Sequence, residues 1–112
     1  MKIQIESGQW RVRVLEHDLN ALLEGNDLTI CCALPDGEQL GFVLRLSDQL
    51  RADLSRKGPD WMMTLPRAEV AELQARLPDR EGIAFELDSG PSGFRLLLQV
   101  DVKDSVKKRR RA

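Results

Sequence analysis

The chain of 112 residues has few of the side chains on which most catalytic and cofactor sites depend. It contains one histidine and two cysteines, and aromatic residues make up only 4% of it. It holds no glycine-rich phosphate loop, and none of the patterns GxSxG, HExxH or CxxC. We therefore expect no catalytic residue, no cofactor and no metal ligand, and we predict that the protein is not an enzyme.

The lone histidine and the two cysteines favour ordinary structural roles. His17 lies at the start of an expected helix, where consecutive side chains point to different sides and cannot share a metal ion. Cys31 and Cys32 are adjacent in an expected strand and point to opposite faces. We expect Cys32 to fill the core beside Ile30 and Leu34. Cys31 would be a reactive thiol only if its own face is open to solvent.

The sequence also lacks a long apolar run and an opening secretory signal. No apolar stretch approaches the about 18 residues of a membrane span, so a cytoplasmic location is expected. The net charge of −1 is unevenly spread, because residues 107–111 read KKRRR. Removing these five leaves 12 basic against 18 acidic residues, a body of net charge −6 that repels phosphate. We predict that residues 107–112 form a disordered basic tail that is dispensable for folding.

Two stretches that lie 51 positions apart carry the same strand-to-helix pattern. Over 61–77, alternating side chains predict a strand, and apolar residues at spacings of three and four then predict a helix. Pro66 suits the first helical position, where its missing N–H costs nothing. A shift of 51 places Trp10 on Trp61 and repeats the pattern over 10–22. Each half of the chain therefore reads strand, helix, strand, strand.

The remaining segments are read from alternation and turn residues. Ser7-Gly8 is expected to form a tight turn or bulge after a first strand that contains Ile3 and Ile5. Ser47 is expected to cap a short helix that carries Leu50 and Leu54 and that ends at Gly58-Pro59. Later strands are expected at 28–34, 40–46, 82–88 and 94–101, with turns at 35–37 and 89–93.

These elements predict an α+β fold in which two βαββ-like pseudo-repeats, about 9–46 and 60–101, form a mainly antiparallel sheet with the helices packed on one face. Residues 1–106 would form a single domain. A duplicated unit explains the similarity of the halves, and chance similarity of two amphipathic segments is the alternative. Duplication predicts that Trp10 and Trp61 occupy equivalent buried positions.

Five local features occur in order along the chain. They are the opening MKIQI, a glycine-containing turn, the basic–apolar strand 11–14, the Leu65-Pro66 step into a helix, and the acidic–basic mix over 99–104. In these features the chain resembles a family of short, uncharacterised bacterial proteins carried as a domain of unknown function. The resemblance covers nearly the whole chain, but its motifs are structural. It implies no established activity and no catalytic residue.

One face of the predicted sheet combines arginines with apolar side chains. If the core residues of each strand face the helices, their neighbours face away. These neighbours include Arg11, Arg13, Arg45 and Arg95, with Val43, Met62 and Leu97 among them. Arginine beside exposed apolar groups is typical of interfaces. We therefore predict a small interaction or adaptor domain that binds a protein partner, or itself, through this outer face.

Two other interpretations of these arginines stay open. The face could be an ordinary solvated surface whose arginines pair with Glu86 and Asp101. The protein could instead bind an anion or nucleic acid through the sheet arginines and the basic tail. The tail carries no aromatic side chain for base stacking, which weakens the nucleic-acid interpretation.

Overall fold

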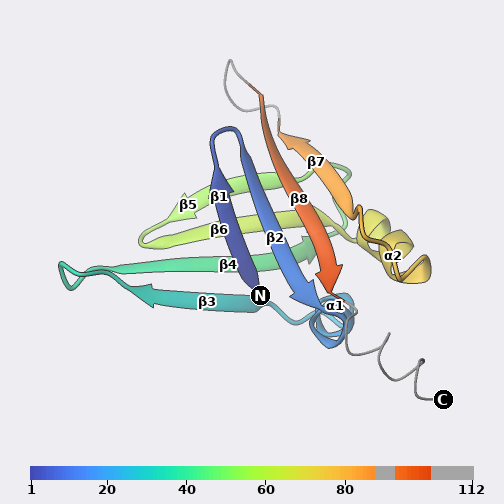
Figure 1. Cartoon of the computed structure of the whole chain (residues 1–112), viewed down its shortest axis with the longest axis horizontal. Coiled ribbons are helices and arrows are strands. Elements are labelled where there is room, and N and C mark those ends of the chain that lie inside the picture. Colours follow the sequence, from blue (N-terminus) through green and yellow to red (C-terminus); the bar gives the residue numbers. More distant parts are fainter. Residues whose placement is uncertain (88–92, 102–112) are drawn as a thin grey trace.

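The computed structural model describes residues 1–87 and 93–101, so residues 89–92 of the predicted turn and the basic tail at 107–112 lie outside the described part. The described residues form eight strands and two helices (Figure 1). In chain order these are β1 (Lys2–Glu6), β2 (Gln9–Leu15), α1 (Glu16–Leu23), β3 (Leu28–Ala33), β4 (Gln39–Ser47), β5 (Asp53–Lys57), β6 (Asp60–Pro66), α2 (Arg67–Ala75), β7 (Ile83–Leu87) and β8 (Phe94–Asp101).

The strands form two four-stranded sheets, and the prediction of a single sheet is therefore wrong. Sheet A has the order β1-β2-β8-β7, and sheet B has the order β3-β4-β6-β5. In each sheet the outer pairs are antiparallel and the central pair is parallel, β2 with β8 and β4 with β6. The strands of sheet A cross those of sheet B (Figure 1). The predicted α+β class is confirmed, in a mixed two-sheet form.

The two sheets have the same strand order once the halves of the chain are exchanged. Replacing β1 to β4 by β5 to β8, and the reverse, converts the order of sheet A into that of sheet B. The 51-residue shift carries β1 and β2 onto β5 and β6 with identical bounds. The similarity therefore begins one strand earlier than predicted, and each half reads ββαββ. Each half also contributes one hairpin to each sheet.

The hydrophobic core lies between the sheets and is closed at one end by the helices. Trp10 of sheet A packs edge-on against three rings, with centroid distances of 5.7 Å to Phe42, 5.5 Å to Trp61 and 5.8 Å to Phe94. Trp10 and Trp61 hold equivalent places in their strands, but Trp10 is buried and Trp61 only half-buried. The guanidinium of Arg56 lies 5.4 Å from the Trp61 ring centroid.

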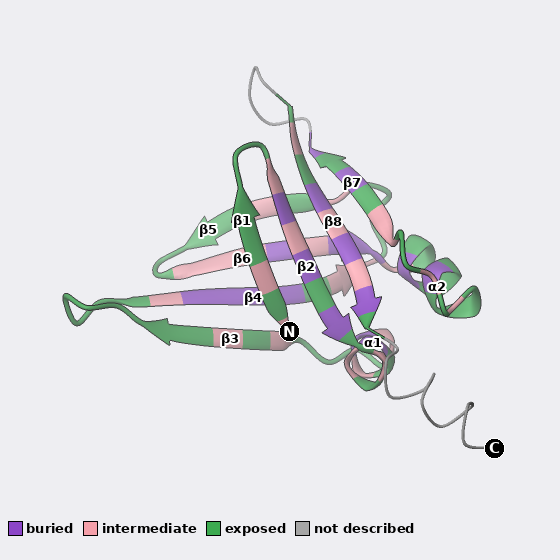
Figure 2. Ribbon diagram, in the orientation of Figure 1, coloured by how far each residue is buried: buried purple, intermediate pink, exposed green. Residues whose placement is uncertain are grey.

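The sequence predicted that the helices pack on one face of a sheet, and this prediction is wrong. They contact one another and lie together where β2, β8 and β4 end (Figure 1). The inner face of each sheet is already covered by the other sheet, which leaves the end of the sandwich as the apolar surface still to be closed. The buried helix residues, drawn purple in Figure 2, are Leu19, Leu22, Val70 and Leu73. Arg67 joins the helices by donating to the Leu23 carbonyl at 3.0 Å.

Two local predictions fail in the second half of the chain. The segment expected to be a helix before Gly58 instead forms β5, with Leu54 packed against the core and Leu50 left 88% exposed. Gly58, at φ +61°, lies in the two-residue turn between β5 and β6, where a positive φ favours glycine. Pro66 ends β6 and caps α2, one residue before the first helical position.

Candidate functional site

The residues of the predicted arginine face are divided between the outer faces of the two sheets, which lie on opposite sides of the molecule. Arg11 lies opposite Leu97, and Arg95 lies opposite Gln9, on the outer face of sheet A. Val43 lies opposite Met62 on the outer face of sheet B. The seven predicted residues are therefore not brought together: Arg11, Arg13, Arg95 and Leu97 belong to sheet A, and Val43, Arg45 and Met62 belong to sheet B. Alternation gave each side chain its outward direction, but not its sheet.

The outer face of sheet A carries three neighbouring cations. Lys2 of β1 lies directly opposite Arg13 of β2, and Arg11 is two residues away on the same face. We call these three residues the cationic strip. Like charges placed directly opposite each other on antiparallel strands destabilise a sheet. The strip is bordered by Gln4, opposite Arg11 on β1, and by Leu97, opposite Arg11 on β8.

The cationic strip has no counter-charge among the described residues. Within 1–87 and 93–101, no ion pair or side-chain hydrogen bond involves Lys2, Arg11, Arg13 or Arg95. Two buried atoms on this face also lack hydrogen-bond partners, Nε of Arg11 and Oε1 of Gln99. Buried polar atoms are nearly always paired, so these two are unusual. The face holds unused positive charge and unused hydrogen-bonding capacity.

No carboxylate of sheet A lies directly opposite a residue of this strip in the strand register. Glu86 lies directly opposite Arg95, and Glu6 directly opposite Gln9. The Glu6 carboxylate accepts hydrogen bonds from Gln4 at 3.0 Å and from Gln9 at 3.4 Å. The predicted pairing with Glu86 is not formed in the part of the chain that the structure describes, although Glu86 is well placed beside Arg95. Of the two carboxylates that the solvated-face interpretation invoked, Glu86 forms no ion pair with these arginines within the described residues, and Asp101 lies on the same face at the end of β8, two residues beyond Gln99, which lies opposite Arg13.

The outer face of sheet B is neutral and locally paired. Val43 is only 9% exposed although it points away from the core, because Met62 and Thr29 flank it in the neighbouring strands. Arg45 is held by Asp27, with an Nη2 to Oδ2 distance of 2.8 Å. Arg45 therefore has an acidic partner, whereas Arg11 and Arg13, on the opposite side of the molecule, form no ion pair within the described residues.

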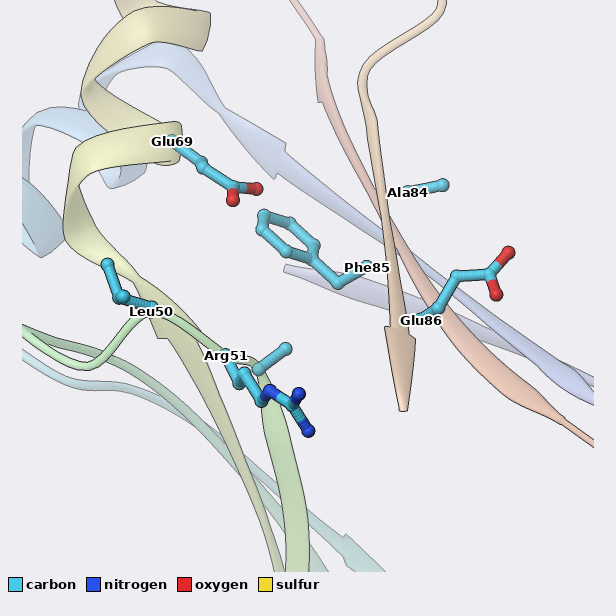
Figure 3. A pocket seen from close by; sticks show the side chains of 7 residues that line it. Leu50, Arg51, Glu69, Ala84, Phe85 and Glu86 are labelled. Atoms are coloured by element: carbon cyan, nitrogen blue, oxygen red, sulfur yellow. The ribbon is translucent and has the colours of Figure 1, made fainter. Parts of the chain in front are cut away.

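A shallow groove of about 300 Å³ runs between the edge of β7, helix α2 and the segment that leads into β5 (Figure 3). It continues into a second hollow of about 390 Å³, which shares Arg51, Ala52 and Glu86 with it. Figure 3 shows the Glu69 carboxylate directed toward Phe85, while Glu86 points away on the other side of β7. These two carboxylates do not form a convergent pair, so the groove offers no acid–base arrangement.

The remaining sequence candidates occupy exposed positions. His17 is a helix residue with 77% of its side chain exposed and with Nε2 3.3 Å from Asp18 Oδ1. Cys31 and Cys32 are both exposed, so the prediction that Cys32 fills the core is wrong. The Cys31 thiol donates to Gln39 Oε1 at 3.0 Å. No cluster of three or more potential metal ligands occurs among the described residues, and no described helix has the length and apolar character of a membrane span.

The comparisons with known proteins give no functional assignment. No protein-family model matches the chain, and no curated protein sequence is similar to it. The resemblance to a bacterial family of unknown function therefore stays a prediction.

Proposed function

We propose that this protein is a small interaction domain that binds an acidic segment of a protein partner through the outer face of sheet A. The observation that carries the proposal is the cationic strip of Lys2, Arg11 and Arg13, which lacks a carboxylate partner in the described chain. An incoming carboxylate would relieve the repulsion between Lys2 and Arg13 and would offer the bidentate geometry that guanidinium groups favour.

The composition of the face favours a peptide over a nucleic acid. Leu97 lies half-buried opposite Arg11 and provides an apolar contact at the border of the cationic strip. Arginine next to an apolar side chain is typical of protein interfaces. The strip carries no aromatic side chain on which a base could stack, and Glu6 and Glu86 border the same face and would repel a continuous phosphate backbone. The sheet therefore suits a short acidic stretch.

The molecule supplies a matched control for this proposal. Arg13 and Arg45 are both exposed arginines in sheet strands, and replacement of either by glutamate changes the net charge equally. A fluorescein-labelled ten-residue peptide of glutamate, aspartate and leucine serves as the probe in fluorescence anisotropy. We expect R13E to weaken binding at least about tenfold, because charge reversal replaces attraction by repulsion. R45E should change binding less than about twofold, since a single remote charge is screened.

Three outcomes would contradict the proposal. Equal loss in R13E and R45E would show that binding follows net charge alone. Absence of peptide binding at low ionic strength would remove the acidic-segment function. The third outcome is tighter binding of a single-stranded oligonucleotide of equal charge, with a logarithm of the binding constant that falls linearly with the logarithm of the salt concentration. This result would favour the nucleic-acid interpretation.

We also infer that the two halves of the chain derive from one duplicated ββαββ unit. The interchangeable strand orders of the two sheets support this inference, as does the shift of 51 residues that relates β1 and β2 to β5 and β6. The proposed function uses only one of the two resulting outer faces.

A further inference from the structure

The outer edge of β3 differs from the other three sheet edges. Edge strands commonly carry charged residues, which prevent them from pairing with strands of other molecules. Strands β1, β5 and β7 follow this rule, and their charged residues are Lys2, Glu6, Asp53, Arg56, Lys57 and Glu86. Strand β3 reads LTICCA and carries no charge at all. Among the edge strands of the two described sheets, β3 is the one without a charged residue.

The main-chain groups available along this edge follow from the β3–β4 ladder. The Leu34 amide donates to the Glu38 carbonyl at 2.8 Å, which makes these two residues a hydrogen-bonded pair. Hydrogen-bonded and non-hydrogen-bonded pairs alternate along an antiparallel ladder. The N–H and C=O groups of Thr29, Cys31 and Ala33 must therefore point away from β4. No strand in the described chain pairs with them.

The side chains of β3 are also poorly covered. The β3–β4 hairpin extends past sheet A, and most of β3 is exposed (Figures 1 and 2). On its inward side Ile30 is half-buried and Cys32 is exposed, and Leu34, directly after the strand, is 39% exposed. An uncharged edge strand with exposed apolar side chains and free main-chain groups has the features of a pairing site.

We propose that β3 pairs antiparallel with β3 of a second copy of this chain, about a two-fold axis at Cys31. The three residues with outward main-chain groups set the register. Thr29 lies opposite the partner's Ala33, and Cys31 opposite the partner's Cys31. Each hydrogen-bonded pair exchanges two bonds, so three pairs give about six main-chain hydrogen bonds. Sheet B of each copy then becomes half of one continuous sheet.

Several features point to a second copy as the partner rather than an unrelated strand. In this register Ile30 lies opposite the partner's Cys32 on the inward side, so the exposed apolar groups cover each other. An uncharged strand is best matched by another uncharged strand, and β3 is the edge in the described sheets that has this character. A two-fold pairing also closes, because both β3 edges are used and no further copy can add.

A charge-swap experiment tests the register in the full-length protein under reducing conditions. Thr29 and Ala33 are exposed on the outer face, so lysine or glutamate at these positions leaves the core untouched. T29K/A33K and T29E/A33E each place like charges opposite one another across the proposed pair. Light scattering should give twice the monomer mass of 12.7 kDa for the wild type. It should give the monomer mass for each variant alone, and twice that mass for their mixture.

Cysteine crosslinking gives an independent reading of the same register. Cα atoms of a hydrogen-bonded antiparallel pair lie about 5.5 Å apart, within the range of a disulfide. Mild oxidation should therefore crosslink the wild type and C32S through Cys31. It should not crosslink C31S, because the two Cys32 residues lie diagonally, about 7–8 Å apart. C31P removes the outward N–H and the exposed thiol hydrogen bond to Gln39 but no bond of the β3–β4 ladder, so this variant should fold and remain monomeric.

Each contrary result is decisive. A wild type that stays at 12.7 kDa at every accessible concentration would overturn the proposal. Dimers of T29K/A33K and T29E/A33E alone, or crosslinking that persists in C31S but not in C32S, would show another interface or another register. Open-ended aggregates in place of a dimer would show that β3 associates without a defined register, which would contradict the proposed two-fold pair.

Discussion

Sheets A and B have equivalent strand orders, but their solvent-facing surfaces differ in chemical character. Their inner faces correspond residue by residue through the register of the central parallel strands. Trp10 pairs with Leu96 in sheet A, as Trp61 pairs with Phe42 in sheet B. All these positions are apolar, because the core between the sheets admits little else.

The outer faces have no such constraint and differ. Sheet A presents Lys2, Arg11 and Arg13 without acidic partners in the described chain, whereas sheet B presents Val43 and an Arg45 that Asp27 neutralises. The edges differ as well, since sheet B has the uncharged strand β3. Packing thus accounts for the apolar inner faces that the two sheets share, and the surfaces that differ are the ones to which we assign binding.

The largest expected effect tests whether the sheets contribute equally to one core. Leu44 of sheet B and Leu98 of sheet A hold equivalent places, opposite Met63 and Val12, and both are almost fully buried. We expect L44A and L98A each to lower the free energy of unfolding by about 2–5 kcal/mol in urea denaturation. L50A, at a position 88% exposed, should change it by less than about 0.5 kcal/mol. A small effect at only one of the two leucines would mean that its sheet packs loosely.

Alanine substitution at two glycines with positive φ distinguishes the cost of backbone strain from the cost of a steric clash. Gly58, at φ +61° in sheet B, has open space around the position of a Cβ. At Gly82, at φ +72° before β7 of sheet A, an added Cβ would clash with the Leu98 carbonyl oxygen. We expect G58A to cost about 1–2 kcal/mol of stability from backbone conformation alone. G82A should cost clearly more in the same denaturation assay, and equal losses would mean that β8 can move away.

Charge reversal at one arginine of each sheet should change stability in opposite directions. R13E turns the like-charged pair with Lys2 into an attractive one, a gain of about 0.2–1 kcal/mol. R45E removes the ion pair with Asp27 and should lose about 0.2–1 kcal/mol. Thermal unfolding at low salt and again at high salt measures both. If R13E destabilises the protein as R45E does, Lys2 and Arg13 do not repel each other in the folded state.

The smallest expected effect lies in the loop that leads from α2 into sheet A. Hydrogen bonding from Arg76, followed by the Glu81 and Gly82 amides, holds the pKa of Asp79 below its ordinary 3.8. A lowered folded-state pKa stabilises the fold above the unfolded value, and this stabilisation is lost as the pH falls through the folded value. NMR titration of R76A should show the Asp79 pKa rising toward 3.8. An unchanged pKa would assign the shift to the amides alone.

Sequence patterns predicted the strands and helices of the first repeated stretch well, because alternation and helical spacing are local properties. They did not reveal β5, since Leu50 and Leu54 are spaced as on a helix and Ser47 imitates a helix cap. The pairing of β5 with β6, which decides its conformation, is a tertiary contact. Hairpin pairing therefore overrides the local pattern in this short edge strand.

The candidate site shows the same limit. Parity correctly turned Arg13 and Arg45 outward, but it could not assign them to different sheets, because each sheet joins strands from both halves of the chain. Cys32 shows a second limit: it has the parity of core residues, yet it is exposed near the end of β3, in the hairpin that extends past sheet A. Alternation gives the direction of a side chain, and burial depends on what lies opposite.

The most direct test of the account is an amide NMR titration of the ¹⁵N-labelled protein with the acidic peptide. We predict that the largest shift changes fall on Lys2, Gln4, Arg11 and Arg13, with Leu97 and Gln99 beside them. The amides of Val43, Arg45 and Met62 on sheet B should stay unchanged. Changes of equal size on both sheets, or changes confined to sheet B, would contradict the assignment of binding to the outer face of sheet A.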